Sequence, residues 1–257
     1  MAPIQTLRSG LVSYWPLWES TGTRYDVAGS GNSLTASASS PTQAAGIQVY
    51  AGSFAAASSQ SLSVADNALV STGDIDYTIC CWVNATTLAA DRAIVSKYGA
   101  VGQRELNLWY NNTSGRLSFT VSGDGTATTV VADTSLGAPS TGTWYFVRAW
   151  HDATGNTINI QTNQLAAISA AHTTGSFDST TALMIGAVVP SAPLNFWNGA
   201  VCEVGFWKRL LTTQEHEWLY NFGKGRTYPF ENSISPMMLG RAPGMMARRN
   251  RITGVIG

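Results

Sequence analysis

The sequence predicts an all-β protein in which antiparallel strands form a sandwich or a barrel. Segments with strand-like alternation are separated by turns about every 8–12 residues. Hydrophobic residues make up 44% of the chain and charged residues only 12%, which leaves ample material for a core. Because 257 residues is an ordinary length for one sandwich, we expect a single β domain.

The first strands are expected before residue 90. Residues 11–17 are typical of an opening strand, which Pro16 confines to an edge or to a strand end. Residues 61–64 alternate between apolar and polar side chains. Residues 77–84 are the clearest strand, and both of its faces are largely apolar. This pattern predicts a central strand that is covered on both sides.

More strands are expected in the middle of the chain. The turn at residues 112–115 joins two of them into a hairpin, and the turn at residues 152–155 joins two others. The predicted segments are 93–97, 106–110, 117–121, 144–150, 157–160 and 183–186.

A strand followed by a short helix is expected between residues 197 and 222. Residues 201–207 supply β-branched and aromatic bulk after a glycine. Thr212 and Glu215 have the spacing of a capping box, so the helix is expected to begin there. Gly223 is expected to end it. The apolar stripe of this helix is Trp218, Leu219 and Phe222.

Charge and cysteine content argue against several classes of protein. The net charge is zero, which gives no basis for binding nucleic acid or a membrane surface. No run approaches the ~20 apolar residues that span a bilayer, and the first ten residues do not resemble a secretory signal. An odd, sparse set of cysteines predicts buried apolar side chains rather than a disulfide framework. The cysteines are Cys80, Cys81 and Cys202.

We expect residues 1–9 to form an N-terminal arm, residues 10–230 the sandwich, and residues 231–257 an extended arm. The last segment is rich in Met and Arg and holds one acidic residue. It is either an unstructured terminus or an arm that docks on a neighbouring subunit, since Met and Arg suit interfaces. Four arginines are weak evidence for nucleic-acid binding. The candidate assembly residues are Met237, Met238, Arg241, Met245, Met246, Arg248, Arg249 and Arg251.

Four parts of the chain resemble, in the same order, the motifs of one family. They are residues 10–17 with the loop 26–32, residues 77–84, residues 144–163 and residues 198–212. The family is the laminin-G-like branch of the concanavalin A-like lectin/glucanase superfamily, and the resemblance covers roughly residues 10–230. It implies a jelly-roll sandwich of two curved antiparallel sheets. Cys202 and Gln164 depart from the family pattern, which often has Asp and Gly there.

The resemblance implies a structural calcium site, and no other cofactor is required. Asp26, Asn32 and Glu203 would supply its oxygens, while Cys202 removes one carboxylate from the pattern. Calcium takes about 6–8 oxygen ligands, so the loss weakens the site. Asp26 and Asn32 are equally typical of turn residues that bond their own backbone.

The superfamily also contains glycoside hydrolases, which need two carboxyl groups about 5–9.5 Å apart. Asp74 and Asp76 have a suitable spacing but look like turn residues. Glu215 and Glu217 lie on the predicted helix, where residues i and i+2 do not face each other. We therefore expect no catalytic activity. The histidines, which are too far apart in sequence to suggest a metal motif, are His151, His172 and His216.

Aromatic residues are the remaining candidates for a glycan site. Trp109 shares a strand face with Asn107 and Asn111, which makes it the best surface candidate. Trp197, expected in a loop, is the second. The competing interpretation is that the tryptophans are core residues, because large aromatics dominate burial.

Two functional hypotheses follow, and a glycoside hydrolase is the disfavoured third. The first is a non-catalytic structural module displayed on a virion, such as a phage capsid decoration or tail/fibre-associated protein, anchored through its terminal arm and able to bind glycans. Its partners would be other subunits of a homo-oligomer, capsid or tail. The second is a stand-alone lectin-like adhesion module that binds cell-surface glycans. Both place the chain on a virion or extracellular surface.

Overall fold

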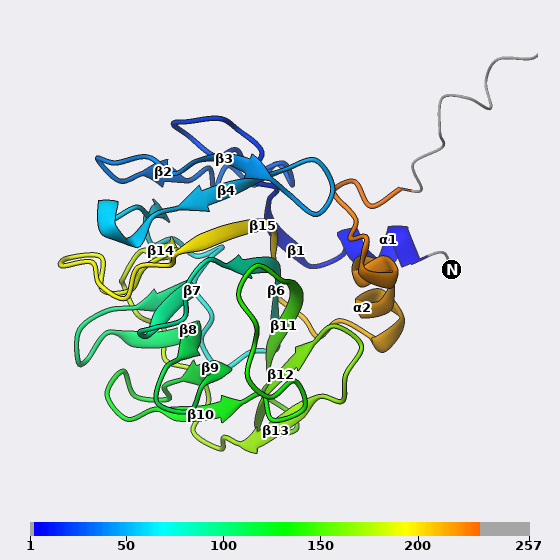
Figure 1. The fold of residues 1–257 in the computed structure, drawn as a ribbon. Helices are drawn as coiled ribbons and strands as arrows, with labels where there is room; N and C mark the ends of the chain where they lie inside the picture. The colour runs from blue at the N-terminus through cyan, green and yellow to red at the C-terminus, as the bar shows by residue number, and fades with distance from the viewer. Residues whose placement is uncertain (1–2, 232–257) are drawn as a thin grey trace, which may run out of the picture.

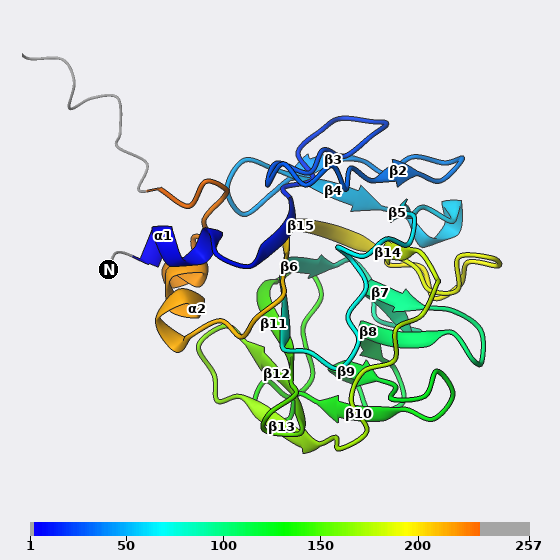
Figure 2. The ribbon, with the colours of Figure 1, turned by 180° about the vertical axis from the view of Figure 1, so that it is seen from behind.

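The computed structural model describes residues 3–231, which form a sandwich of two antiparallel sheets (Figures 1 and 2). The jelly-roll sandwich that the resemblance implies is thereby confirmed. The strands of the first sheet, called sheet A, are β1 (Leu11–Trp15), β3 (Thr42–Ala45), β4 (Tyr50–Phe54), β6 (Tyr77–Ala85), β11 (Trp144–Asp152), β12 (Thr157–Thr162), β13 (Ile168–Ala171) and β15 (Gly199–Trp207). They follow the order β13-β12-β11-β6-β15-β4-β3, and β1 pairs with β15.

Sheet B faces sheet A across the core. Its order is β10-β9-β8-β7-β14-β5-β2, and every strand pair recorded within it is antiparallel. Its strands are β2 (Thr35–Ala36), β5 (Leu62–Val64), β7 (Arg92–Tyr98), β8 (Arg104–Asn111), β9 (Arg116–Val121), β10 (Thr129–Ala132) and β14 (Leu183–Ile185). The predicted hairpins are β8–β9 and β11–β12.

Strand β6 lies in the middle of sheet A and is buried along nearly its whole length. Ile79, Cys81 and Val83 belong to the core between the sheets, whereas Cys80 and Trp82 belong to a second cluster on the outer face. The prediction of a central strand covered on both sides is confirmed. All three cysteines are buried and free, as expected.

The second cluster is covered by two helices and by the last described residues. Helix α1 (Pro3–Arg8) contacts helix α2 (Thr213–Tyr220) beside the end of the described chain (Figure 1). Leu7 of α1 is completely buried, and its carbonyl accepts a hydrogen bond of 2.8 Å from Trp207 Nε1. Within the segment 1–9 that was expected as an arm, residues 3–8 thus form a helix that packs on the sandwich. No helix within residues 3–231 is long and apolar enough to cross a membrane.

Helix α2 begins as predicted but ends earlier. The Thr212 side chain accepts from the Glu215 backbone, and the Glu215 side chain accepts from the Thr212 backbone, so the capping box is present. The helix ends at Tyr220, and its C-cap is Asn221 rather than Gly223. Phe222 was expected in the apolar stripe, and that expectation is wrong: the backbone is left-handed at Asn221 and Phe222, and the Phe222 side chain is 86% exposed.

Candidate functional site

The three candidate calcium ligands use their oxygens within the protein. Asp26 Oδ1 accepts from the backbone N–H groups of Tyr14 and Ala28, each at 3.0 Å, and Oδ2 accepts from Ser30 and Asn32. These bonds are typical of a loop-closing Asp. Each carboxylate oxygen of Asp26 therefore already accepts two hydrogen bonds, which leaves it no lone pair for a cation.

Glu203 does not complete a calcium site either. Its carboxyl is 4% exposed and accepts a hydrogen bond of 2.7 Å from the Tyr14 hydroxyl. Burial raises the pKa of Glu203 to about 8, although hydrogen bonds from Tyr14 and Thr227 lower it. A carboxyl that is mostly protonated at neutral pH is a poor ligand for calcium. Within residues 3–231, no cluster of three His, Cys, Asp or Glu side chains is arranged to hold a metal. The residues do not fit the ion that the resemblance implies.

The candidate glycan-binding residues differ in their exposure to solvent. Trp197 is 1% exposed and lies in the core, so its ring has no face for a sugar and that prediction is wrong. Asn107 is 6% exposed, and Asn111 accepts from the backbone of Thr113 and Ser114 in the β8–β9 turn. Trp109 is half-buried, and its role in glycan binding stays a prediction.

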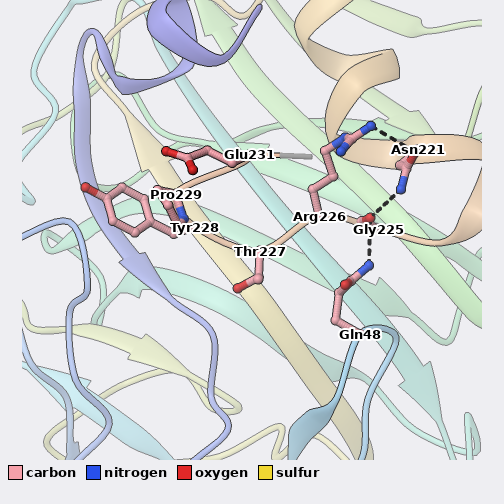
Figure 3. Close-up of a pocket in the computed structure, with 8 residues that line it drawn as sticks. All are labelled: Gln48, Asn221, Gly225, Arg226, Thr227, Tyr228, Pro229 and Glu231. Carbon is pink, nitrogen blue, oxygen red and sulfur yellow. Dashed lines mark hydrogen bonds between the residues drawn. The ribbon is translucent and has the colours of Figure 1, made fainter. Parts of the chain in front are cut away.

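A pocket of about 310 Å³ lies between the β3–β4 turn and the segment after α2 (Figure 3). We call it the Gln48 pocket. Gln48 Nε2 and Asn221 Nδ2 both donate to the Gly225 carbonyl, at 2.8 and 2.9 Å, and Arg226 Nη2 donates to Asn221 Oδ1 at 3.2 Å. Because these polar groups bond one another, they hold the segment in place. The lining residues are Gln48, Asn221, Gly225, Arg226, Thr227, Tyr228, Pro229 and Glu231.

A larger pocket of about 510 Å³ shares Asn221 and Arg226 with the first. We call it the Phe222 pocket. Two of its lining residues contact each other: the Arg226 guanidinium stacks 3.9 Å from the centre of the Trp218 ring, and Arg226 Nε donates to the Trp218 carbonyl at 2.9 Å. The lining residues are Gln164, Gln214, Glu217, Trp218, Asn221, Phe222 and Arg226.

Phe222 is held in an unfavourable backbone conformation. Asn221 and Phe222 have φ values of 49° and 54°, and Gly223 follows with 81°. Asn and Gly tolerate the left-handed region, but for Phe it costs of the order of 1–2 kcal/mol. The same turn exposes the ring of Phe222, which is the most exposed large hydrophobic side chain among the described residues. Because Phe222 combines a left-handed backbone with an exposed aromatic ring, it is a candidate functional position.

Three polar side chains complete the Phe222 pocket. Gln164, Gln214 and Glu217 are exposed, and none of them makes a side-chain hydrogen bond or ion pair with another described residue. They contrast with the self-bonded groups of the Gln48 pocket. The Phe222 pocket therefore offers one bare aromatic ring, two amides and one carboxylate to a ligand.

Sequence reasoning missed the Phe222 pocket because Phe222 matched the helical stripe. The run Asn221-Phe222-Gly223 carries a usable signal, since two of its residues are the commonest in left-handed caps. Gln164 comes from the turn after β12, about fifty residues away in sequence, and no local pattern connects it with α2.

A model of the concanavalin A-like lectin/glucanases superfamily, of the laminin-G type, matches residues 56–215 of the chain. No curated protein sequence gives a significant match. Similar solved structures include the binding domain of Paraclostridial Mosquitocidal Protein 1, with a TM-score of 0.68 and 14% identity over 84% of this chain and 53% of that one. The chain spans about half the length of that toxin binding domain.

Two further similar structures were solved in complex with sugars. Domain 4 of AbnA, a GH43 extracellular arabinanase from Geobacillus stearothermophilus solved with arabinotriose, has a TM-score of 0.62 and 14% identity over 80% of this chain and 96% of that one. The botulinum neurotoxin serotype D ligand binding domain, solved with N-acetylneuraminic acid, has a TM-score of 0.63 and 10% identity over 86% and 53%. At these identities the likeness shows the fold alone.

The family match covers more than half of the chain, and the two sheets have the architecture that the family motifs imply. The chain therefore belongs to the laminin-G-like branch of the concanavalin A-like lectin/glucanase superfamily.

Proposed function

We propose that this chain is a non-catalytic carbohydrate-binding module whose ligand occupies the Phe222 pocket. The observation that carries the proposal is the ring of Phe222, held 86% exposed by a strained turn beside polar side chains that have no described protein partner. The volume of the Phe222 pocket, about 510 Å³, lies within the range of small-ligand pockets.

The chemistry of the pocket suits a sugar. The C–H face of a pyranose can stack on an aromatic ring, which buries apolar surface on both partners. Sugar hydroxyls both donate and accept, as do the amides of Gln164 and Gln214, while the Glu217 carboxylate accepts only. One apolar face beside a few placed polar groups is the usual composition of such a site.

The similar solved structures support the proposal at the level of the fold. Two of them were solved with arabinotriose and with N-acetylneuraminic acid, so the fold is used for sugar binding elsewhere. Because function depends on the site rather than on the fold, the residues of the Phe222 pocket carry the argument.

The test is a glycan array followed by calorimetry with any sugar that binds. Phe222→Ala should weaken binding by at least about tenfold, or ~1.4 kcal/mol, because it removes the stacking surface. Tyr25→Ala is the matched control, since Tyr25 is another exposed aromatic, outside the pocket. Trp109→Ala tests the competing site on β8. Wild-type affinity in Phe222→Ala, or a loss only in Trp109→Ala, would contradict the proposal.

We also propose that the chain acts within a larger assembly, with a virion surface as its setting and residues 231–257 as the anchoring arm. The support is compositional, because this segment combines four methionines and four arginines with one acidic residue. The eight candidate assembly residues lie outside the described part of the chain. Native mass of the full chain, compared with a chain that ends at Phe230, checks the self-assembly part of this proposal.

A further inference from the structure

The Phe222 pocket is lined by two charged side chains, Glu217 and Arg226, which differ in how far the protein already engages them. Glu217 lies on the exposed face of α2, and its carboxylate has no hydrogen bond or ion pair with another described residue. Its neighbour Glu215 is the opposite case: Arg209 holds both of its oxygens, at 2.7 and 2.8 Å. The Glu217 carboxylate is therefore available to a ligand in the pocket.

Arg226 is the one cationic side chain among the residues that line this pocket, and it is already engaged. Its Nε bonds the Trp218 carbonyl at 2.9 Å, and its Nη2 bonds Asn221 Oδ1 at 3.2 Å. One face of the guanidinium also rests on the Trp218 ring. Releasing these donors for an anionic ligand would break the contacts that fix the segment after α2. The pocket thus presents the Glu217 carboxylate, which has no described hydrogen-bond partner, and the Arg226 guanidinium, whose Nε and Nη2 are hydrogen-bonded within the protein.

We propose that Glu217 makes the pocket selective for uncharged sugars over acidic ones, an inference that rests on the proposed function. A carboxylate only accepts hydrogen bonds, so it pairs with the hydroxyl groups of a neutral sugar. A sialic or uronic acid would place a second negative charge beside Glu217, while the Nε and Nη2 donors of Arg226 already bond Trp218 and Asn221. Such repulsion is electrostatic, and salt should screen it over a Debye length of about 10 Å at 0.1 M.

The experiment compares paired glycans on one array: neutral oligosaccharides beside their sialylated and glucuronylated counterparts, at about 20 mM and about 300 mM salt. The wild-type chain should bind each neutral member about tenfold more tightly at low salt, which corresponds to ~1.4 kcal/mol. The difference should shrink at high salt. In Glu217→Gln it should shrink at both salt concentrations, because the amide carries no charge.

Asp178→Asn is the matched control, since it removes one exposed carboxylate that does not line the pocket. It should leave the ratio of neutral to acidic binding unchanged. Equal or tighter binding of the acidic glycans by wild type, or an unchanged ratio in Glu217→Gln, overturns the inference and leaves the proposed function standing. If no glycan binds at all, the proposed function fails and the inference fails with it.

Discussion

At the scale of single residues, burial gives Glu203 an unusual protonation state. The carboxyl lies in the cluster between sheet A and residues 226–230, where the Tyr14 hydroxyl bonds both Glu203 and the Arg226 carbonyl, at 2.7 and 3.1 Å. Its backbone is also strained, with a φ of 53° at a break in the β15–β6 register. Burial raises the pKa of Glu203 to about 8, so the folded protein keeps this carboxyl protonated at neutral pH.

The raised pKa predicts a pH-dependent stability. A carboxyl whose pKa is higher in the folded state binds a proton on folding, so its contribution is complete below the unfolded value of about 4.3 and is lost as the pH rises to about 8. We expect the free energy of unfolding of wild type to fall by a few kcal/mol over this range relative to Glu203→Gln. Urea denaturation at several pH values measures it. Parallel profiles for the two proteins would contradict the prediction.

A buried ion pair shows what residue patterns alone do not reveal. Lys97 and Glu105 are both completely buried and form an ion pair of 2.6 Å. Glu105 also accepts from the backbone and hydroxyl groups of Thr72 and Ser179. These bonds offset the desolvation of the pair. The network ties two loops to sheet B, and neither residue stands out in the sequence.

At the scale of elements, most of the interior strands were predicted and the strands at the sheet ends were not. The sequence analysis did not identify β2, β3, β4, β10 or β13, which are two to five residues long. All of these except β4 lie at the ends of the two sheets. Edge strands are packed on fewer sides, so their alternation is short and weak. Interior strands such as β6 and β11 carry the strongest pattern because neighbours surround them.

Helix α2 offers a direct test of its predicted start. Thr212→Ala removes the side-chain acceptor for the Glu215 N–H and should lower the free energy of unfolding by about 1 kcal/mol. Thr213→Ala, at the first helical residue next to it, is the control and should have little effect because Thr213 is exposed and is not the cap. Urea denaturation of the two variants measures the difference. Equal stability would show that the capping box contributes nothing here.

At the scale of the whole molecule, the two ends of the described chain meet on the outer face of sheet A. Arg8 of α1 pairs with Glu231 at 3.1 Å. Glu231 also lines the Gln48 pocket (Figure 3). Both side chains are well exposed, so the pair itself contributes little to stability. The segment proposed as an anchoring arm therefore starts at the Gln48 pocket, which shares Asn221 and Arg226 with the proposed binding site.

The native mass tests the proposed arm. If residues 231–257 dock on a neighbouring subunit, the full chain should assemble and a chain that ends at Phe230 should be a monomer. Phe230 is completely buried and packs on Tyr14, so the shortened chain keeps the cluster on sheet A. If both chains are monomers, or if the shortened chain assembles as the full chain does, the proposal that residues 231–257 mediate self-assembly is contradicted.

The sequence by itself determined the fold class, most of the interior strands, the buried cysteines and the start of α2. These features depend on residues a few positions apart, whose alternation and capping chemistry act locally. Only the tertiary structure decided which aromatic rings are exposed. Trp197 lies in the core and Phe222 in solvent because burial depends on segments that are distant in sequence. The Phe222 pocket exists for the same reason: the turn after β12 comes to lie beside α2 only when sheet A has formed.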